Sequence, residues 1–466
     1  MFRNLQNKPG ATLAVVAVVQ FMVSLDLSVV NVGLPQIANG LGFSATGVTW
    51  VIHAYALTFG GLLLLGGKAS DRYGRKQLLL AGLGLFGVAS LLGGFAQEPG
   101  HLVAARAAQG IGAAMLAPAA LALLATTFPS GRARVRAFGV WSAMNAAGGA
   151  LGVLIGGVLT QYASWRWVMF VNVPMAAVAF AVAWAGVAGV AAVRRGRPDV
   201  LGAVLATAGM TTLVFGVVRT DRHAWGSPTT LITLAIAVVL LAGFVLVERT
   251  TRREPLVRLG LFTNRSVSGA NVFNLLVGAA MASSFYFMSL YLQRVLDVGP
   301  ALTGLMFLPF ALGVVVGSVL AIKLGYRVPA KSLLIGGALL TAIGFAWFGQ
   351  ISADGRFLID VLGPSIVASI GFGLCLGPLV ATATTDVAPH ETGTASGLLN
   401  SSRQLGASLG LAALGTAAQH HTETTSSLND GYARGLTLCS AVLIVAVLTA
   451  AVSLPRHSPQ PARSAA

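Results

Sequence analysis

The sequence predicts an all-α membrane protein that crosses the bilayer many times, and three observations support this prediction. The 466 residues are 55% hydrophobic and only 9% charged. Their mean hydropathy of +0.79 is higher than a water-soluble domain of this size would show. Apolar runs of about 20 residues, the length that a helix needs to cross a bilayer, follow one another along the chain. Since backbone groups in lipid must bond within their own segment, we expect each run to be a helix.

Fourteen runs are long enough to span the membrane. In chain order they lie at residues 11–34, 48–66, 78–96, 102–127, 137–161, 167–187, 200–218, 229–247, 267–292, 302–322, 332–350, 357–385, 394–418 and 435–454. An even number of spans places both ends of the chain on one side of the membrane. Most of the 30 Lys and Arg residues fall in the loops on that side, so the positive-inside rule predicts that both termini are cytoplasmic.

The positive charge of the chain is explained by its topology. A formal net charge of +16 would suggest a nucleic acid partner for a soluble protein. Here the cations lie in short loops, so we expect contact with the lipid bilayer and no nucleic acid. Cys375 and Cys439 fall in apolar runs, which leaves no basis for a disulfide framework or a metal site. No cofactor is expected, because the G-x-G-x-x-G match at residues 82–87 lies inside an apolar run with no strand before it.

The stretch at residues 67–76 is predicted to be a short turn between the second and third spans. Gly67 and Gly74 tolerate the positive φ and the close backbone approach that a tight turn needs. Asp71 can accept hydrogen bonds from Arg72 or Arg75, or face the N-terminus of another helix at residues 391–394. These five residues are therefore a candidate latch.

This stretch resembles the loop between spans two and three of the major facilitator superfamily, whose pattern is G-x-x-x-D-R-x-G-R-K/R. The resemblance implies a transporter with the major facilitator fold. In that family the Asp and Arg of the loop hold the cytoplasmic ends of two six-helix halves together in the outward-open state.

An internal repeat in the sequence supports the division of the chain into two halves. The spacing of Lys68, Arg72 and Lys76 recurs at positions 323, 327 and 331, eight spans later, although a tyrosine at position 326 replaces the aspartate. This offset fits two six-helix halves separated by two inserted helices. The expected domains are an N-terminal half at residues 1–193, the inserted helices with their linkers at 194–258, a C-terminal half at 259–454 and a cytoplasmic tail at 455–466.

Further motifs extend the resemblance over nearly the whole chain. The segments 25–35, 106–114, 164–174 and 397–406 are similar to patterns of the drug:proton antiporters with fourteen spans. The fifth span departs from that family, whose pattern there is G-P-x-x-G-G. Gly152, Gly156 and Gly157 are present, but Val153 replaces the proline. Glycines four residues apart still allow close helix packing. The helix kink that the proline would produce must come from another feature or be absent.

Three residues within the spans are candidates for carrying a coupling proton. Asp26, Arg106 and His53 lie at similar depths if helices rise about 1.5 Å per residue. An ionised carboxylate is costly in lipid, so we expect Asp26 to face the cavity, where Arg106 would favour its charged form while it is close. The alternative is a fixed Asp26–Arg106 ion pair that only satisfies two buried charges. For His53 the alternative is a core residue with satisfied hydrogen bonds.

Other polar and aromatic residues within spans are candidates for lining a cavity. The first group of candidates is Trp141, Asn145, Asn271, Asn274 and Arg403. A second group at residues 285–288 with Tyr291 could line a pocket for flat apolar ligands, and lipid-facing packing explains it equally well.

These observations predict an exporter of antibiotics or other amphipathic drugs that works in exchange for protons in the bacterial inner membrane, with a monomer as the functional unit. A transporter of a small metabolite with the same fold, working as exporter or importer, remains the alternative. We do not expect an enzyme, because no H-E-x-x-H motif or carboxylate pair at one depth is present.

Overall fold

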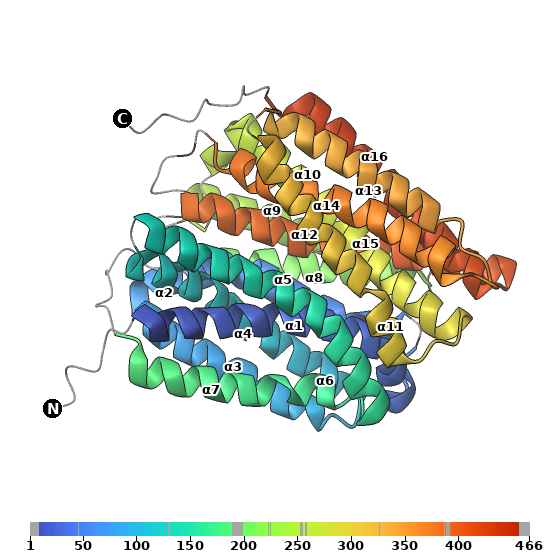
Figure 1. Cartoon of the computed structure of the whole chain (residues 1–466), viewed down its shortest axis with the longest axis horizontal. Coiled ribbons are helices and arrows are strands. Elements are labelled where there is room, and N and C mark those ends of the chain that lie inside the picture. The colour runs from blue at the N-terminus through green and yellow to red at the C-terminus, as the bar shows by residue number, and fades with distance from the viewer. Residues whose placement is uncertain are drawn as a thin grey trace. The chain divides into compact units, whose positions relative to one another are not determined.

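The computed structural model describes residues 9–44, 46–128, 131–188, 199–221, 223, 225–251, 255–256, 259–325, 327–385, 387 and 392–455. Within these ranges every regular element is a helix (Figure 1). Thirteen helical segments in the described part of the chain are long and apolar enough to cross a membrane. The expected span at 394–418 lies within α15 (Thr392–Thr425), which is longer but more polar than the others because it carries Asn400, Arg403 and Gln404. All fourteen predicted spans therefore coincide with helices.

The chain forms two compact units, and the first comprises residues Met1–Val257 with the short segment Val298–Leu305. Its helices are α1 (Pro9–Leu41), α2 (Trp50–Tyr73), α3 (Arg75–Gly94), α4 (Pro99–Thr127), α5 (Gly131–Tyr162), α6 (Trp167–Phe170), α7 (Asn172–Gly186), α8 (Val200–Val218) and α9 (Pro228–Thr250). In this unit α1 packs against α5, and α4 packs against both α2 and α3. The two expected inserted helices, α8 and α9, pack on each other, and α8 also packs against α2.

The second unit comprises residues Arg258–Asp297 and Met306–Ala466. Its helices are α10 (Arg265–Leu290), α12 (Leu308–Gly325), α13 (Ala330–Phe348), α14 (Gly363–Ala383), α15 and α16 (Leu428–Ser453), while α11 (Pro300–Met306) belongs almost entirely to the first unit. Here α10 packs against α15 and α16, and α14 packs against α12 and α13. Two π-helical segments, Tyr291–Val295 and Phe357–Leu362, adjoin α10 and α14.

Glycines explain why α1 and α5 approach closely. Added side chains at Gly148, Gly152 and Gly156 would meet the backbone of α1, and a Cβ at Gly156 would lie 2.7 Å from the carbonyl oxygen of Val29. This four-residue spacing places all three on one face of α5, where small residues allow two backbones to touch. α5 contains no proline and continues as one helix from Gly131 to Tyr162.

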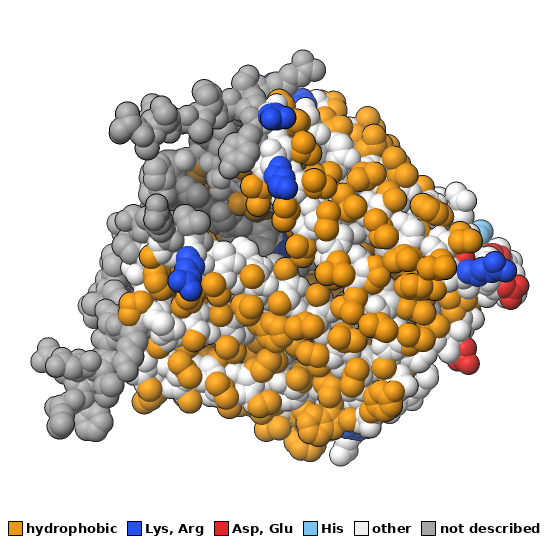
Figure 2. Space-filling view, in the orientation of Figure 1, with side chains coloured by type: hydrophobic (Ala, Val, Ile, Leu, Met, Phe, Trp, Pro, Cys, Tyr) orange, Lys and Arg blue, Asp and Glu red, His pale blue; other side chains and the backbone are white. Residues whose placement is uncertain are grey.

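The surface agrees with a membrane environment. Large apolar side chains are exposed along the spans, for instance Val239 and Leu246 on α9. On the face shown in Figure 2, hydrophobic side chains cover most of the described surface, and few charged groups interrupt them. Such a surface would be unstable in water and is typical of helices that face lipid.

Candidate functional site

Asp26 lies at the centre of a buried polar cluster in the first unit. Its carboxylate accepts a hydrogen bond of 2.6 Å from Nη1 of Arg106 and one of 2.8 Å from Nδ2 of Asn172. Gln109 approaches the same carboxylate at 3.4 Å through Nε2. The three partners come from α4 and from the first residue of α7. Asp26 on α1 therefore joins three helices that are distant in sequence.

Arg106 is held from several directions besides the carboxylate. Its Nε donates to the backbone carbonyl of Val51 at 3.0 Å, and its Nη1 also donates to Oε1 of Gln109 at 2.8 Å. The guanidinium lies 4.4 Å from the ring centroid of Tyr55, a cation–π arrangement. The cation thus has stabilising contacts with α2 and α4 that do not depend on Asp26.

Gln109 extends the cluster to α3. Its Nε2 donates to the hydroxyl of Ser90 at 2.7 Å, and that hydroxyl donates to the carbonyl of Phe86 at 2.7 Å. We did not assign roles to Gln109, Asn172 or Ser90 from the sequence. The R-x-x-Q spacing carried a usable signal for Gln109, because residues three apart share a helix face. Asn172 lies in the motif at 164–174, but neither it nor Ser90 carries a signal of its partner, because only the fold brings α7 to α1 and α3 to α4.

The expectation that Asp26 faces the cavity is wrong for this structure. Asp26 is 0% exposed and Arg106 is 1% exposed. Charges so deep are tolerated only when they are paired and hydrogen-bonded, and here both are. The geometry is that of the ion pair, with the carboxylate enclosed between helices.

His53 is also 0% exposed, on α2 near Val51 and Tyr55. Its ring stands edge-on to Trp50 with centroids 5.6 Å apart. Neither ring nitrogen has a hydrogen-bond partner among the described residues. His53 is therefore not a core histidine with satisfied hydrogen bonds, and the structure places no bond between it and Asp26.

The candidate latch differs from the expected ten-residue turn. α2 continues through Tyr73 and α3 begins at Arg75, so Gly74 alone forms the turn, with φ of 97°. This angle requires glycine. Gly67 is not a turn residue, because it lies within α2. Near the membrane, helical hydrogen bonds satisfy backbone N–H and C=O groups better than an open loop would.

The charged members of the latch are described only in part. The guanidinium of Arg72 lies 5.6 Å from the ring of Tyr73. Arg75 is half-buried at the start of α3. The side chains of Asp71 and of the expected partner segment at residues 391–394 lie outside what the structure describes, so their contact remains a prediction.

The polar candidates for a cavity fall into two groups. In the first unit, Asn145 is exposed on α5 and its Oδ1 accepts from Ser24 at 2.6 Å and Gln20 at 2.7 Å, while Trp141 packs on the hydrophobic core. In the second unit, Asn271 and Asn274 are buried. Asn274 donates to the carbonyl of Leu399 on α15.

The remaining candidate, Arg403, is half-buried on α15 and donates to Oδ1 of Asn400 at 3.1 Å. Asn274 joins α10 to α15, whereas Asn271 donates within α10 to the carbonyl of Val267 at 2.8 Å. Asn145 and Arg403 keep accessible surface.

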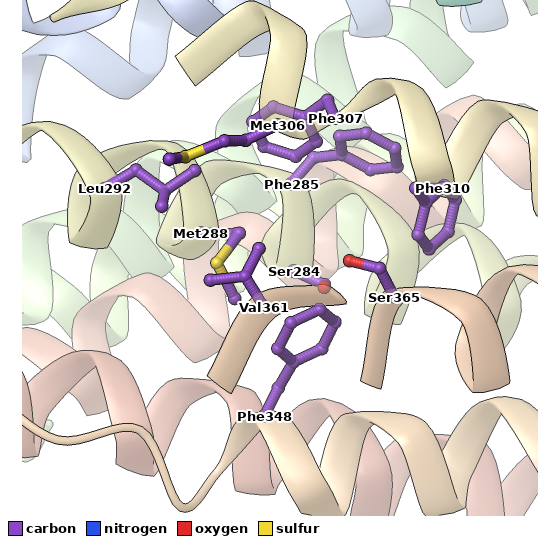
Figure 3. Close-up of a pocket in the computed structure, with 10 residues that line it drawn as sticks. All are labelled: Ser284, Phe285, Met288, Leu292, Met306, Phe307, Phe310, Phe348, Val361 and Ser365. Carbon is purple, nitrogen blue, oxygen red and sulfur yellow. The ribbon is translucent and has the colours of Figure 1, made fainter. Parts of the chain in front are cut away.

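An aromatic pocket lies wholly within the second unit (Figure 3). Its apolar lining includes Phe285, Phe307, Phe310, Phe348, Met288 and Met306. The sequence grouping at 285–288 with Tyr291 is thus divided: Phe285 and Met288 line the pocket, whereas Tyr286, Phe287 and Tyr291 are buried without lining it.

Comparison with known proteins places the chain in a family. Residues 16–411 match the family model of the Major Facilitator Superfamily. The chain is 40% identical over 460 residues to the cephamycin export protein of Amycolatopsis lactamdurans, covering 96% of this chain and 93% of that protein. It is 39% identical to the puromycin resistance protein of Streptomyces alboniger, covering 94% and 89%. It is 32% identical to the methylenomycin A resistance protein of Bacillus subtilis, covering 95% and 94%.

Solved structures agree on the fold. A POT family transporter has a TM-score of 0.70 at 16% identity, covering 96% of this chain and 97% of that chain. A D-xylose-proton symporter has a TM-score of 0.67 at 14% identity, covering 97% and 99%. The all-helical fold is the one that these transporters share. The chain belongs to the major facilitator superfamily and is a multi-pass membrane protein.

Proposed function

We propose that this protein exports antibiotics or other amphipathic drugs across the bacterial inner membrane in exchange for protons. The observation that carries the proposal is its similarity, over more than nine-tenths of the chain, to proteins named for cephamycin export and puromycin resistance. These two drugs differ in chemistry, so the proposal names a class of substrate and not one compound.

Asp26 is the proposed proton carrier, and Arg106 is its switch. While the two are paired, the guanidinium favours the ionised carboxylate. If α1 and α4 separate during transport, Asp26 is left in a dry environment where the protonated form costs far less. Arg106 tolerates the separation because Gln109, the carbonyl of Val51 and the ring of Tyr55 still contact it. His53, buried beside this cluster without a described partner, is a second acceptor for the proton.

The remaining parts of the proposal concern conformational change and topology. The segment from Gly67 to Arg75, with Gly152, Gly156 and Gly157 on α5, would set how the helices move against each other. We propose a functional monomer with both termini and the tail at 455–466 in the cytoplasm. Its two six-helix halves would move during transport, and accessible polar groups such as Asn145 in one half and Arg403 in the other are candidate substrate contacts.

One observation favours the second candidate, a transporter of a small metabolite with the same fold. α5 lacks the proline of the antiporter pattern and is not interrupted. A coupling mode other than antiport would fit this departure.

Measuring substrate flux in inverted membrane vesicles distinguishes the two candidate functions, antibiotic export and metabolite transport. The vesicles come from a host that lacks its own exporters, and a panel of labelled antibiotics and metabolites is supplied outside. Acidifying the lumen should drive antibiotic accumulation, and a protonophore should abolish it. Accumulation of metabolites alone, or antibiotic flux that ignores the proton gradient, would overturn the proposal.

A further inference from the structure

Two side chains of α1 fix the orientation of Asn145 on α5. Oγ of Ser24 donates to Oδ1 of Asn145 at 2.6 Å, and Nε2 of Gln20 donates to the same oxygen at 2.7 Å. An amide group whose oxygen accepts two hydrogen bonds directs its nitrogen away from both donors. In the part of the chain that the structure describes, no group accepts a hydrogen bond from Nδ2 of Asn145, and this side chain is exposed. Asn145 therefore presents an oriented N–H donor at the surface of the first unit.

This donor lies deep within a membrane span. Asn145 comes eight residues after the start of the expected span at 137–161, and Gln20 comes nine residues after the start of the span at 11–34. At about 1.5 Å per residue, both side chains lie about 12–14 Å inside a hydrocarbon core of about 30 Å. An exposed amide at that depth would be costly in contact with lipid. We therefore expect water or substrate, and not lipid, beside Asn145.

The lipid-facing side of α5 is a different one. Leu151 and Val158 on this helix are large and apolar, and they are 41% and 42% exposed. With 3.6 residues per turn, both point about 120–140° away from Asn145. Gly149, one turn after Asn145 on its own side of α5, has no side chain that would cover the amide. The helix thus separates an apolar exposed face from a face with a polar group and room beside it.

We propose that Asn145 binds the transported compound by donating a hydrogen bond from Nδ2 to an uncharged oxygen, such as an amide or ketone carbonyl. Ser24 and Gln20 are positioning residues that hold the amide in this orientation. The recorded hydrogen bonds of the three side chains involve no charged group, so the site offers no counter-ion to an ionised ligand. The proposal rests on the proposed drug export and specifies the class of substrate.

The site can be tested apart from proton coupling. Asp26 follows Ser24 by two residues, which places it on the opposite face of α1, and its partners come from α4 and α7. Binding at Asn145 is therefore measured at equilibrium without a proton gradient. Loss of binding with retained export of other antibiotics would contradict only this site, and loss of export with retained binding would contradict only the transport proposal.

The first experiment tests whether water reaches Asn145. Asn145→Cys and Leu151→Cys are each placed in lipid nanodiscs, which leave both membrane faces open, and treated with a charged methanethiosulfonate reagent that does not enter lipid. Cys375 and Cys439 are buried, so the wild type gives the background. Asn145→Cys should react about tenfold faster than Leu151→Cys. Equal rates would place Asn145 outside a water-filled path and overturn the proposal.

The second experiment measures binding of radiolabelled chloramphenicol, a neutral antibiotic with one amide carbonyl, to the full chain in nanodiscs. Empty nanodiscs correct for partition into lipid. The wild type should bind saturably, and Asn145→Leu should bind about three- to tenfold more weakly, since one hydrogen bond is lost. Ser24→Ala should cause a smaller loss, because Gln20 still holds the amide. Ser28→Ala is the matched control on α1, since its hydroxyl donates to the backbone of its own helix, and it should bind as the wild type does.

Asn145→Asp separates a ligand contact from a structural amide. The carboxylate still accepts hydrogen bonds from Ser24 and Gln20, but it has no N–H to donate and it carries a negative charge. Chloramphenicol should bind more weakly and the monocation tetraphenylphosphonium more tightly, so the ratio of the two affinities should shift about tenfold. An unchanged ratio in a variant that unfolds at the wild-type temperature would overturn the proposal. Absence of saturable chloramphenicol binding to the wild type would overturn it too.

Discussion

The guanidinium of Arg106 donates a 2.6 Å hydrogen bond to the carboxylate of Asp26, joining α4 to α1 across 80 residues of sequence. Both side chains are removed from solvent. A pair in this setting either stays together as a structural element or opens to let the carboxylate take up a proton. The two roles have different consequences when the charge is removed.

Asp26→Asn should abolish export driven by a pH gradient while leaving exchange of drug across the membrane. The amide resembles the protonated carboxyl group in shape and neutrality, so the substrate cycle continues without a proton to carry. The measurement is drug flux in inverted vesicles with and without the gradient. Asp430→Asn is the control, since Asp430 is exposed and lies in the second unit. Proton movement in response to drug in the Asp26→Asn protein would rule out Asp26 as the carrier.

A purely structural pair predicts another pattern. Loss of one partner of a buried ion pair costs about 3–5 kcal/mol, so Asp26→Asn would then be poorly folded. The exchanged variant Asp26→Arg, Arg106→Asp would restore both folding and transport. Protein levels in the membrane, read together with flux, distinguish the two roles.

Asp71→Asn should strongly lower transport while the protein remains in the membrane. The proposed latch needs a carboxylate to bond to Arg72, Arg75 or a helix N-terminus, and an amide lacks the charge. Export rates and membrane protein levels are measured side by side. Wild-type export from a well-expressed Asp71→Asn protein would contradict the latch.

Gly74→Ala should destabilise the protein, whereas Gly67→Ala should not. Gly74 has φ of 97° and ψ of 135°, a conformation that costs other residues about 1–3 kcal/mol. Gly67 lies in α2, and a Cβ there would meet nothing nearer than Pro118 at 3.8 Å. Thermal unfolding in one detergent compares the two variants. Equal melting temperatures would contradict the assignment of Gly74 as the turn.

Gly156→Ala should weaken the packing of α1 on α5. Its Cβ would lie 2.7 Å from the carbonyl oxygen of Val29, so the helices must move apart at a cost of about 1–3 kcal/mol. Gly149→Ala is the matched control on the same helix, where the nearest atom, Oγ of Ser28, is 3.9 Å away. Only the first substitution should lower the melting temperature. A similar loss in both would contradict the assigned contact, because Gly→Ala raises helix propensity and would not by itself lower the melting temperature.

The number and order of the spans were predictable from the sequence, because lipid requires about 20 apolar residues for each crossing and rejects unsatisfied backbone groups. Asp26 and Arg106 were predictable as candidate functional residues, because ionisable residues are rare within membrane spans. Gly74 was predictable as a turn residue. The sequence determined, in this way, which segments enter the membrane and which charges accompany them.

Only the tertiary structure decided how those charges are satisfied. Hydropathy states how apolar a span is but not which face meets which neighbour, so the convergence of Ser90, Gln109 and Asn172 on the Asp26 cluster was invisible. The same limit explains why the sequence places Gly67 in a turn although it lies within α2: polar side chains at the end of a span do not stop a helix whose backbone hydrogen bonds continue.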